Sequence, residues 1–367
     1  MCIYNYLIVG AGFAGSVMAE RLASQFNKKV LVVEKRNHIA GNAYDEYDAH
    51  GILVHKYGPH IFHTNSKQVF DYLSLFTEWR FYEHKVLANY RGELFPIPIN
   101  GITINKFFGL SLTAEEEIKN FLLSKAEKRY PIMNSEDIIV NQVGRELFEA
   151  FFKNYTKKQW NLEPNELAPT VCGRIPVRFN DDCRYFTDKY QFMPKEGYTK
   201  MFEKMLNHKN IEIILDTDYK KIINDVKFEK MIYTGPIDYY FDYIHGKLPY
   251  RSIRFEWENL NSEKSQDVAV INFVDNKCVY TRVTEYKHLT GQLNDSTSLS
   301  YEYPLIGGDP FYPIPSEDNR KLYNKYKSEK ERESNTIFCG RLAEYQYYNM
   351  DQVVGNAIML LKRFSNG

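Results

Sequence analysis

A glycine-rich motif near the N-terminus has the residue types and spacing to bind a dinucleotide. An apolar run, Tyr6 to Val9, leads into a G-x-G-x-x-G motif at residues 10–15. The first glycine of such a motif permits a tight turn, the second lets the backbone approach a pyrophosphate, and the third lets the helix pack on the strand. Glu34, after the next apolar run, can accept hydrogen bonds from ribose hydroxyls. The pattern therefore predicts a dinucleotide site.

The elements that must position this motif can be predicted from the same segment. Tyr6–Val9 and Val30–Val33 are all-apolar runs, typical of strands buried on both faces, and apolar residues recur at helical spacing between them. Residues 336–341 predict another strand ending in glycine. A helix is then expected from the spacing of Val353, Ala357, Leu361 and Phe364. This late return to the nucleotide-binding unit, together with a polar loop at 35–43, favours FAD over NAD.

The middle of the chain predicts both helices and strands. Thr113-x-x-Glu116 has the pattern of a capping box that opens a helix. A second helix is expected from about Ser135 to Tyr155, and its aromatic stripe is explained on periodicity alone by core packing. Strand-like runs follow at 211–215, 231–234, 268–274 and 279–284. The expected class is α/β with inserted elements.

Composition narrows the function classes. Lys plus Arg and Asp plus Glu number 47 each, which argues against nucleic-acid binding or membrane attachment through bulk positive charge. The cysteines form no C-x-x-C pair, so we expect neither a disulfide framework nor a metal site: Cys2, Cys172, Cys183, Cys278, Cys339. No membrane-spanning run is found, and a cytoplasmic location is expected. Aromatic residues reach 15%, which favours a ligand with planar or sugar-like parts.

Several longer blocks resemble one known family. They read YGPHIFHT at 57–64, EAFFKNYTKKQW at 149–160, RIPVRFN at 174–180, YTRVTE at 280–285 and GRL at 340–342. Together they closely resemble the prokaryotic UDP-galactopyranose mutases over essentially the whole chain. The resemblance implies that UDP-galactopyranose and UDP-galactofuranose are interconverted through a covalent adduct of the anomeric carbon with N5 of reduced FAD. It also implies a reductant such as NAD(P)H, a homodimer, and a role in cell-surface polysaccharide synthesis.

The resemblance also implies a three-part fold. We expect a discontinuous Rossmann-like FAD-binding domain at 1–68, 199–245 and 325–367. A helical domain is expected at 102–171. A twisted antiparallel β-sheet domain for the substrate is expected at 69–101, 172–198 and 246–324.

Site residues carried over from the family fall into three groups. The residues expected to be catalytic are Arg174, Arg282 and His63. Those expected to bind substrate, besides the two arginines, are Phe151, Phe152, Tyr155, Thr156, Trp160, Tyr185, Tyr312, Tyr347, Asn349 and His84. Those expected to bind the cofactor are Gly10, Gly12, Phe13, Ala14, Gly15, Glu34, Lys35, Gly41, Asn42, His60, Ile61, Gly340, Arg341, Met350 and Asp351. Arg251 and Arg341 are weaker candidates, which surface or structural ion pairs would explain almost as well.

Three departures from the family pattern keep alternatives open. Ala40 stands where the family often has a first glycine, Asn349 where it often has Asp, and His84 where it often has Asn. The last difference leaves the sugar open, including UDP-N-acetylgalactosamine. A flavin oxidoreductase of amine-oxidase-like fold and a non-catalytic UDP-sugar binder are the rival readings. An oxidase pocket has no need of an arginine and tyrosine set for a diphosphate, which favours the mutase.

Overall fold

The computed structural model describes residues 3–364, with side chains up to residue 362. Cys2 and the side chain of Phe364 therefore lie outside the described residues. The cysteines within them are free thiols: Cys172, Cys183, Cys278 and Cys339. Among the described helices, none is both long and apolar enough to cross a membrane.

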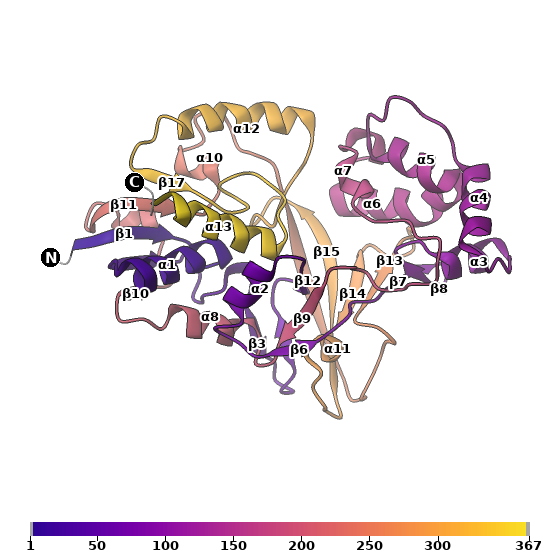
Figure 1. Ribbon diagram of the computed structural model, residues 1–367, viewed down its shortest axis with the longest axis horizontal. Coiled ribbons are helices and arrows are strands. Elements are labelled where there is room, and N and C mark those ends of the chain that lie inside the picture. The colour runs from indigo at the N-terminus through magenta and orange to yellow at the C-terminus, as the bar shows by residue number, and fades with distance from the viewer. Residues whose placement is uncertain (1–2, 365–367) are drawn as a thin grey trace.

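A parallel sheet of five strands forms the nucleotide-binding unit, on the left of Figure 1. Its strand order is β10 (Ile211–Ile214), β2 (Val30–Val33), β1 (Ile3–Val9), β11 (Lys227–Tyr233) and β17 (Thr336–Phe338). The first two predicted strands thus pair in the centre, and the C-terminal strand returns to the same sheet. The predicted strand–helix–strand unit and its late completion are confirmed.

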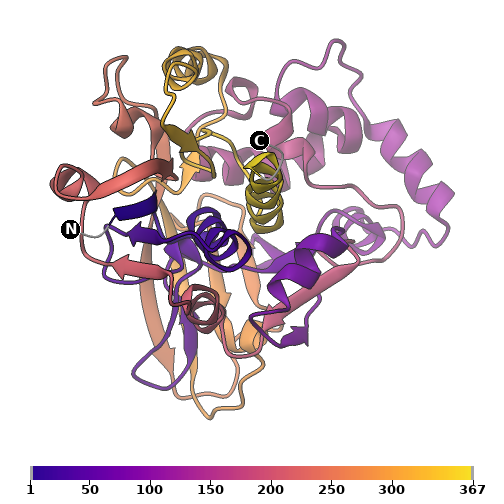
Figure 2. The same cartoon turned by 60° about the vertical axis from the view of Figure 1, so that its left-hand side comes forward.

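Both faces of this sheet are buried, as the all-apolar strand sequences predict. Side chains alternate along a strand, so Ile8 and Val32 join one core cluster while Leu7 and Val33 join the other. The first face is covered by α1 (Phe13–Phe26), α8 (Tyr198–Leu206) and α13 (Met350–Phe364). The second is covered by α9 (Tyr219–Ile222), α10 (Ile237–Tyr240) and α12 (Glu317–Lys330). In Figures 1 and 2, α1 and α13 lie side by side.

A seven-stranded sheet extends away from this unit. Its order is β16 (Tyr312–Pro313), β12 (Tyr250–Leu260), β15 (Thr297–Ile306), β14 (Arg282–Glu285), β13 (Val270–Phe273), β7 (Val86–Tyr90) and β8 (Glu93–Ile97). Neighbours are antiparallel except β13 and β7, which pair in parallel. The expected antiparallel sheet is therefore mixed at one junction. The strand predicted at 279–284 begins at Arg282, so residues 279–281 belong to the preceding loop.

Smaller elements connect these layers. A three-stranded sheet joins β5 (Phe62–Thr64), β9 (Tyr190–Pro194) and β6 (Trp79–Phe81), and β3 (Asp45–Tyr47) pairs with β4 (Leu53–His55). Two further helices are α2 (Lys67–Leu73) and α11 (Tyr286–Thr290). Short 3₁₀ turns lie at Gly41–Ala43 and Pro164–Glu166.

The helical region stands beside β7 and β8, at the right of Figure 1. It contains α3 (Gly101–Phe108), α4 (Glu115–Lys125), α5 (Ser135–Leu147), a π-helix (Phe148–Lys153), α6 (Asn154–Trp160) and α7 (Thr170–Gly173). The aromatic stripe of the sequence falls in the π-helix, and Phe148, Phe151 and Phe152 are buried there. The region thus brings α6 toward the end of the seven-stranded sheet.

Two local predictions in this region were wrong. The carboxylate that caps α4 is Glu117, which accepts the backbone N–H groups of Thr113 and Ala114, rather than Glu116. The helix expected from Ser135 to Tyr155 is not continuous, because Gly144 adopts φ 80° and ψ 174° and a π-helix follows. A Cβ on Gly144 would lie 2.4 Å from the carbonyl oxygen of Lys125, so packing against α4 requires the glycine.

Candidate active site

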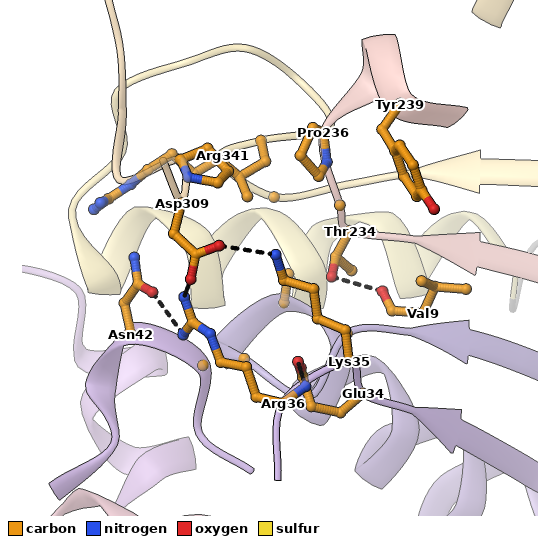
Figure 3. A pocket seen from close by; sticks show the side chains of 18 of the residues that line it. Val9, Glu34, Lys35, Arg36, Asn42, Thr234, Pro236, Tyr239, Asp309 and Arg341 are labelled. Atoms are coloured by element: carbon orange, nitrogen blue, oxygen red, sulfur yellow. Dashed lines mark hydrogen bonds and ion pairs between the residues drawn. The ribbon is translucent and has the colours of Figure 1, made fainter. Parts of the chain in front are cut away.

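A cavity of about 640 Å³ opens at the carboxyl ends of the parallel strands. Its wall comes from the turns that follow β1, β2, β11 and β17, and from the loop at 307–311 (Figure 3). Ligands bind at this edge in open parallel sheets, and the volume is ordinary for a ligand site. Of the expected cofactor residues, these line it: Gly10, Gly12, Phe13, Ala14, Glu34, Lys35, Gly41, Asn42, His60, Gly340, Arg341 and Met350. We call it the dinucleotide cavity.

Glycines set the shape of this cavity where two segments meet. A Cβ on Gly10 would lie 2.2 Å from Thr234 Oγ1, and one on Gly41 would lie 2.9 Å from Gly12 Cα. Gly10 and Gly41 also have positive φ values of 102° and 56°. No side chain caps the N-terminus of α1, so its first N–H groups are free to bind a phosphate. These features fit the pyrophosphate of a dinucleotide.

Gly15 contributes to the cavity indirectly. It does not line the wall, and a Cβ there would lie 1.9 Å from the carbonyl oxygen of Gly10. Its small size therefore allows α1 to approach β1, which holds the turn at Gly10 in place.

Glu34 is buried at the cavity wall and already holds the turn. Its Oε2 accepts the backbone N–H of Ala11 at 2.8 Å, and its Oε1 accepts that of Arg36 at 3.0 Å. A carboxylate has about four lone-pair positions, so ribose hydroxyls can still donate to it. The same side chain can thus fix the backbone and bind the ribose.

The sequence did not predict an ion-paired group across the cavity, Asp309 with Lys35 and Arg36, which we call the charged strap. Figure 3 shows Asp309, from the loop after β15, reaching toward Lys35 and Arg36. The ion-pair distances are 3.2 Å to Lys35 Nζ and 3.4 Å to Arg36 Nη2, and Arg36 also donates to Asn42 Oδ1 at 2.9 Å. No local motif indicates this contact, because more than 270 residues separate its partners.

A second group of side chains lies beside this cavity. The Arg–Tyr cluster consists of Arg174, Arg282, Arg341, Tyr155, Tyr312 and Tyr347. The Arg282 guanidinium donates to the Tyr155 hydroxyl at 2.9 Å. Tyr312 stacks on Tyr347 with ring centroids 5.5 Å apart. Arg174 lies 4.8 Å from the centroid of Tyr347, and Arg341 lies 5.3 Å from the same ring.

Arg341 joins the two groups. It lines the dinucleotide cavity and lies over the rings of Tyr312 and Tyr347 in the cluster. The family resemblance predicted Arg341 as a weaker candidate for the cofactor site, and the structure places it on the cavity wall and beside both rings.

Burial and charged neighbours together set the pKa values in the Arg–Tyr cluster. Burial alone would lower the pKa of Arg282, but the Glu302 carboxylate, 3.4 Å away, and Tyr155 raise it well above its usual value. The Tyr347 ring beside Arg174 raises the pKa of that guanidinium. Burial would raise the pKa of Tyr347, yet Arg174 and Arg341 bring it below its ordinary value. The cluster is therefore permanently cationic, with a polarised phenol that donates strongly.

Two histidines lie near the cluster. His63 Nδ1 is 2.8 Å from Asp188 Oδ2, and the His63 ring stacks on Phe186 at 3.6 Å. His84 is buried and shares a 3.0 Å hydrogen bond between its Nδ1 and the Tyr82 hydroxyl. Burial, with Arg282 and His63 nearby, lowers the pKa of His84 to about 3. His84 is therefore neutral at physiological pH.

His60 in the dinucleotide cavity is also neutral. Burial, with His55 beside it, lowers the pKa of His60 to about 3. Its Nδ1 lies 2.8 Å from the carbonyl oxygen of Gly58 and therefore carries the proton. The cavity thus presents an uncharged imidazole to its ligand.

The remaining expected site residues lie in varied surroundings. Phe151 packs against Phe95 in the core at 5.2 Å, and Tyr185 contacts the ring of His84 at 5.7 Å. Phe152, Thr156 and Trp160 are buried. Asn349 is exposed, and Ile61 is absent from the cavity wall. Asp351 accepts a hydrogen bond from Thr64 at 2.8 Å.

Arg251 does not belong to the Arg–Tyr cluster. Its guanidinium bonds to backbone carbonyls of α6. Over residues 3–364, no group of three or more His, Cys, Asp or Glu side chains could hold a metal ion.

The fold and these two sites together define an α/β protein with a Rossmann-like nucleotide-binding unit and, beside its cavity, a cationic, aromatic cluster. Comparison with known proteins agrees. A Rossmann-like NAD(P)-binding domain matches residues 8–76, and the UDP-galactopyranose mutase family matches residues 150–347. The chain belongs to the UDP-galactopyranose mutase family.

Curated relatives match over nearly the full length. A Klebsiella pneumoniae protein named "Probable UDP-galactopyranose mutase" is 38% identical, with 98% of this chain and 94% of that protein covered. An Escherichia coli dTDP-fucopyranose mutase is 36% identical, with 96% of each chain covered. A Mycoplasma genitalium UDP-galactopyranose mutase is 35% identical, covering 96% of this chain and 92% of that protein.

Solved structures share the fold. A reduced UDP-galactopyranose mutase superposes with a TM-score of 0.79 at 15% identity, covering 100% of this chain and 94% of that chain. A putrescine oxidase double mutant superposes with a TM-score of 0.59 at 12% identity, covering 98% and 99%. The Rossmann-like domain and these enzyme neighbours point to a flavin as the cofactor class. Because an oxidase shares the fold, fold alone does not separate mutase from oxidase.

Proposed function

We propose that this chain interconverts UDP-galactopyranose and UDP-galactofuranose, with reduced FAD as cofactor. One observation supports this most: Arg341 lines the dinucleotide cavity and also contacts Tyr312 and Tyr347 in the Arg–Tyr cluster. A diphosphate bound by the cluster would therefore lie next to the cofactor. An oxidase acting on an uncharged substrate has no use for this set.

The dinucleotide cavity fits FAD by its backbone. The turn at Gly10 and Gly12 and the N-terminus of α1 would hold the pyrophosphate, and Glu34 the ribose. His60, Gly340 and Arg341 would lie toward the flavin end. Reduced flavin, when bound, supplies the nucleophile for the anomeric carbon, which explains how a reaction without net redox change can need it.

The chain's own residues would manage the charge of the departing UDP. As the bond from the anomeric carbon to UDP breaks, negative charge grows on the β-phosphate. Arg174 and Arg282 offer guanidinium forks suited to phosphate oxygens, and Tyr347 offers a hydroxyl polarised by Arg174 and Arg341. Donors fixed in advance bind this charge better than they bind the ground state.

Aromatic side chains would hold the uridine and position the sugar. Tyr155 keeps its hydroxyl on Arg282, and its ring, which packs against the core on one side, would stack on a uracil with the other. His63, fixed by Asp188, would face the sugar together with His84 and Tyr185. The imidazole rings of His60 and His84 are both neutral, so each can donate or accept a hydrogen bond without adding charge to the site.

The further setting of this function is also proposed. The division into FAD, helical and sheet domains carries over from the resemblance, as do a homodimer, a cytoplasmic location and a reductant such as NAD(P)H. Product would feed cell-surface polysaccharide synthesis.

An anaerobic conversion assay tests the proposal. Purified protein is incubated with UDP-galactofuranose, with and without dithionite, and UDP-galactopyranose is quantified by chromatography. We expect conversion only in the reduced sample. If neither sample converts while yellow flavin is bound, the assay is repeated with UDP-N-acetylgalactosamine as substrate. Conversion of that sugar alone would correct the substrate, and none at all would support the oxidoreductase alternative.

A further inference from the structure

Lys158, on α6, reaches across to the seven-stranded sheet. Its ammonium donates to the carbonyl oxygens of Phe273 at 2.6 Å, Cys278 at 3.1 Å and Tyr280 at 3.1 Å. An ammonium has three donors, so this side chain is fully satisfied by backbone. Phe273 ends β13, and Cys278 and Tyr280 lie in the connection from β13 to β14, which delivers Arg282 to the Arg–Tyr cluster.

Arg251, on β12, holds the same helix from the other side. Its Nε donates to the carbonyl oxygen of Gln159 at 2.9 Å, and its Nη2 to that of Lys158 at 3.5 Å. These carbonyls lie in the last turn of α6, where they have no partner within the helix and where a cation is favoured. Arg251 also pairs with Tyr312 in the strand register between β12 and β16.

Among the described residues, backbone carbonyls rather than an acidic side chain hold both cations, and Asp275 acts on Lys158 only at longer range. No salt bridge joins Lys158 or Arg251 to a carboxylate there, and burial lowers the pKa of both. A desolvated charge is costly unless hydrogen bonds compensate it. Here the compensation comes from carbonyls of two particular segments, and within the part of the chain that the structure describes only Arg251 Nη1 stays buried without a partner. The contacts thus tie α6 to β12 and to the connection before Arg282.

The tied segments carry the two members of one hydrogen bond. Tyr155 lies one turn before Lys158 on α6, and Arg282 follows Tyr280 by two residues. Their side chains meet at 2.9 Å. We propose that Lys158 and Arg251 are positioning residues that keep Tyr155 and Arg282 in register for a nucleoside diphosphate. The proposal rests on the function above only in taking this cluster as the diphosphate site.

The first test is UDP affinity. Isothermal titration of flavin-loaded protein with UDP is compared for wild type, K158M and K157M. Lys157 is the matched control, because it lies on the same helix, is exposed and pairs with Glu163. We expect K158M to raise the Kd for UDP about tenfold, within the range of coupling between residues that share partners. K157M should stay within about twofold. Equal Kd values for K158M and K157M would overturn the proposal.

A double-mutant cycle separates positioning from general destabilisation. Y155F removes the hydroxyl that Arg282 contacts and leaves the ring. If Lys158 acts through that contact, K158M should raise the Kd for UDP only about twofold in the Y155F background. The same tenfold loss in both backgrounds would mean that Lys158 acts independently of the pair, and would contradict the proposal.

Substitution of Arg251 provides an independent test of the same proposal. R251M should repeat the K158M pattern, whereas R254M, on the same strand but exposed and paired with Glu256, should leave the Kd for UDP unchanged. K158R retains the charge and several donors, so it should recover the affinity to within about threefold of wild type. Flavin absorbance and thermal unfolding are recorded for each variant. Loss of folding in both K158M and R251M would assign the contacts to fold stability and overturn the proposal.

Failure of the proposed function gives a different result. If wild type does not bind UDP at all, the cluster is not a diphosphate site. If wild type binds UDP and K158M and R251M bind it equally well, the cluster remains a diphosphate site and only the positioning role fails.

Discussion

Backbone forms the tightest part of the dinucleotide cavity, whereas side chains alone form the Arg–Tyr cluster. At Gly41, on the cavity wall, an added Cβ would lie 2.9 Å from a backbone carbon, and at Gly15, which supports the wall from behind, it would lie 1.9 Å from a carbonyl oxygen. In the cluster, Arg282 touches a tyrosine 127 positions away in the sequence. The dinucleotide cavity therefore depends on the absence of a side chain at its glycines. The Arg–Tyr cluster depends on charged residues that are far apart in the sequence. Substitutions should fail differently in the two regions.

The largest effect is expected from adding one methyl group to the glycine motif. G15A forces α1 away from β1, so we expect the free energy of unfolding to fall by about 3 kcal/mol or more. The purified protein should also lose its flavin. Absorbance near the flavin band and thermal unfolding measure both. G355A on α13 is the matched control, because its Cβ would make an ordinary 3.6 Å contact with Val69. Normal flavin content in G15A would refute the steric account of the cavity.

The second-largest effect is expected in the Arg–Tyr cluster, and it should lower turnover without changing flavin content. R282M and R174M should each lower turnover by about 10²–10³, as loss of one fixed donor to a developing negative charge does. Flavin content should remain that of wild type, because neither residue lines the dinucleotide cavity. Steady-state kinetics with UDP-galactofuranose measures the loss, and R254M is the control. A loss under about threefold in both variants would remove the arginines from the mechanism.

Each of the two regions has a neutral histidine nearby, and acid stability measures this shared property. His60 and His84 have folded pKa values near 3, against about 6.5 in an unfolded chain. Between those values the unfolded state binds more protons, so stability is present above about pH 6.5 and falls as pH falls toward 3. Each histidine contributes a slope of about 1.4 kcal/mol per pH unit in that window.

The variant H84N should remove one such slope. Urea unfolding at pH 7, 6, 5 and 4 would then show the free energy of unfolding falling less steeply than in wild type. H50N, which replaces an exposed histidine, serves as the control. Parallel curves for wild type and H84N would mean that His84 is not desolvated.

The smallest effect is expected at the charged strap. The Asp309 carboxylate is about half exposed, with 49% relative side-chain exposure, so its pairs with Lys35 and Arg36 are screened by solvent. D309A should raise the Kd for flavin at most about fivefold in low salt, and the difference should vanish near 0.5 M salt. A larger loss that persists near 0.5 M salt would contradict the screened ion-pair account of Asp309.

The sequence predicted the dinucleotide region well because its signals are local. The apolar runs, the glycine spacing and Glu34 all lie within 34 residues, and both strand pairing and helix follow from them. The kink at Gly144 could not be predicted, because it depends on the approach of Lys125 from another helix. The capping error between Glu116 and Glu117 arose from a one-residue ambiguity in where α4 begins.

The cluster was reached only through family resemblance. Nothing in local spacing indicates that Arg174, Arg282 and Tyr347 meet, since they come from three segments. The strap at Asp309 and the contacts of Lys158 were missed for the same reason. Each depends on which strands pair in the seven-stranded sheet, and no periodicity encodes that order.

The central claim is an isomerisation beside a flavin that is not consumed. The most direct test records the flavin spectrum anaerobically while UDP-galactofuranose is converted by protein reduced once with dithionite. We predict many turnovers per flavin with the spectrum staying that of the reduced cofactor, and the same final sugar ratio from either starting isomer. Reoxidation of flavin in step with substrate loss would contradict the account and identify an oxidoreductase.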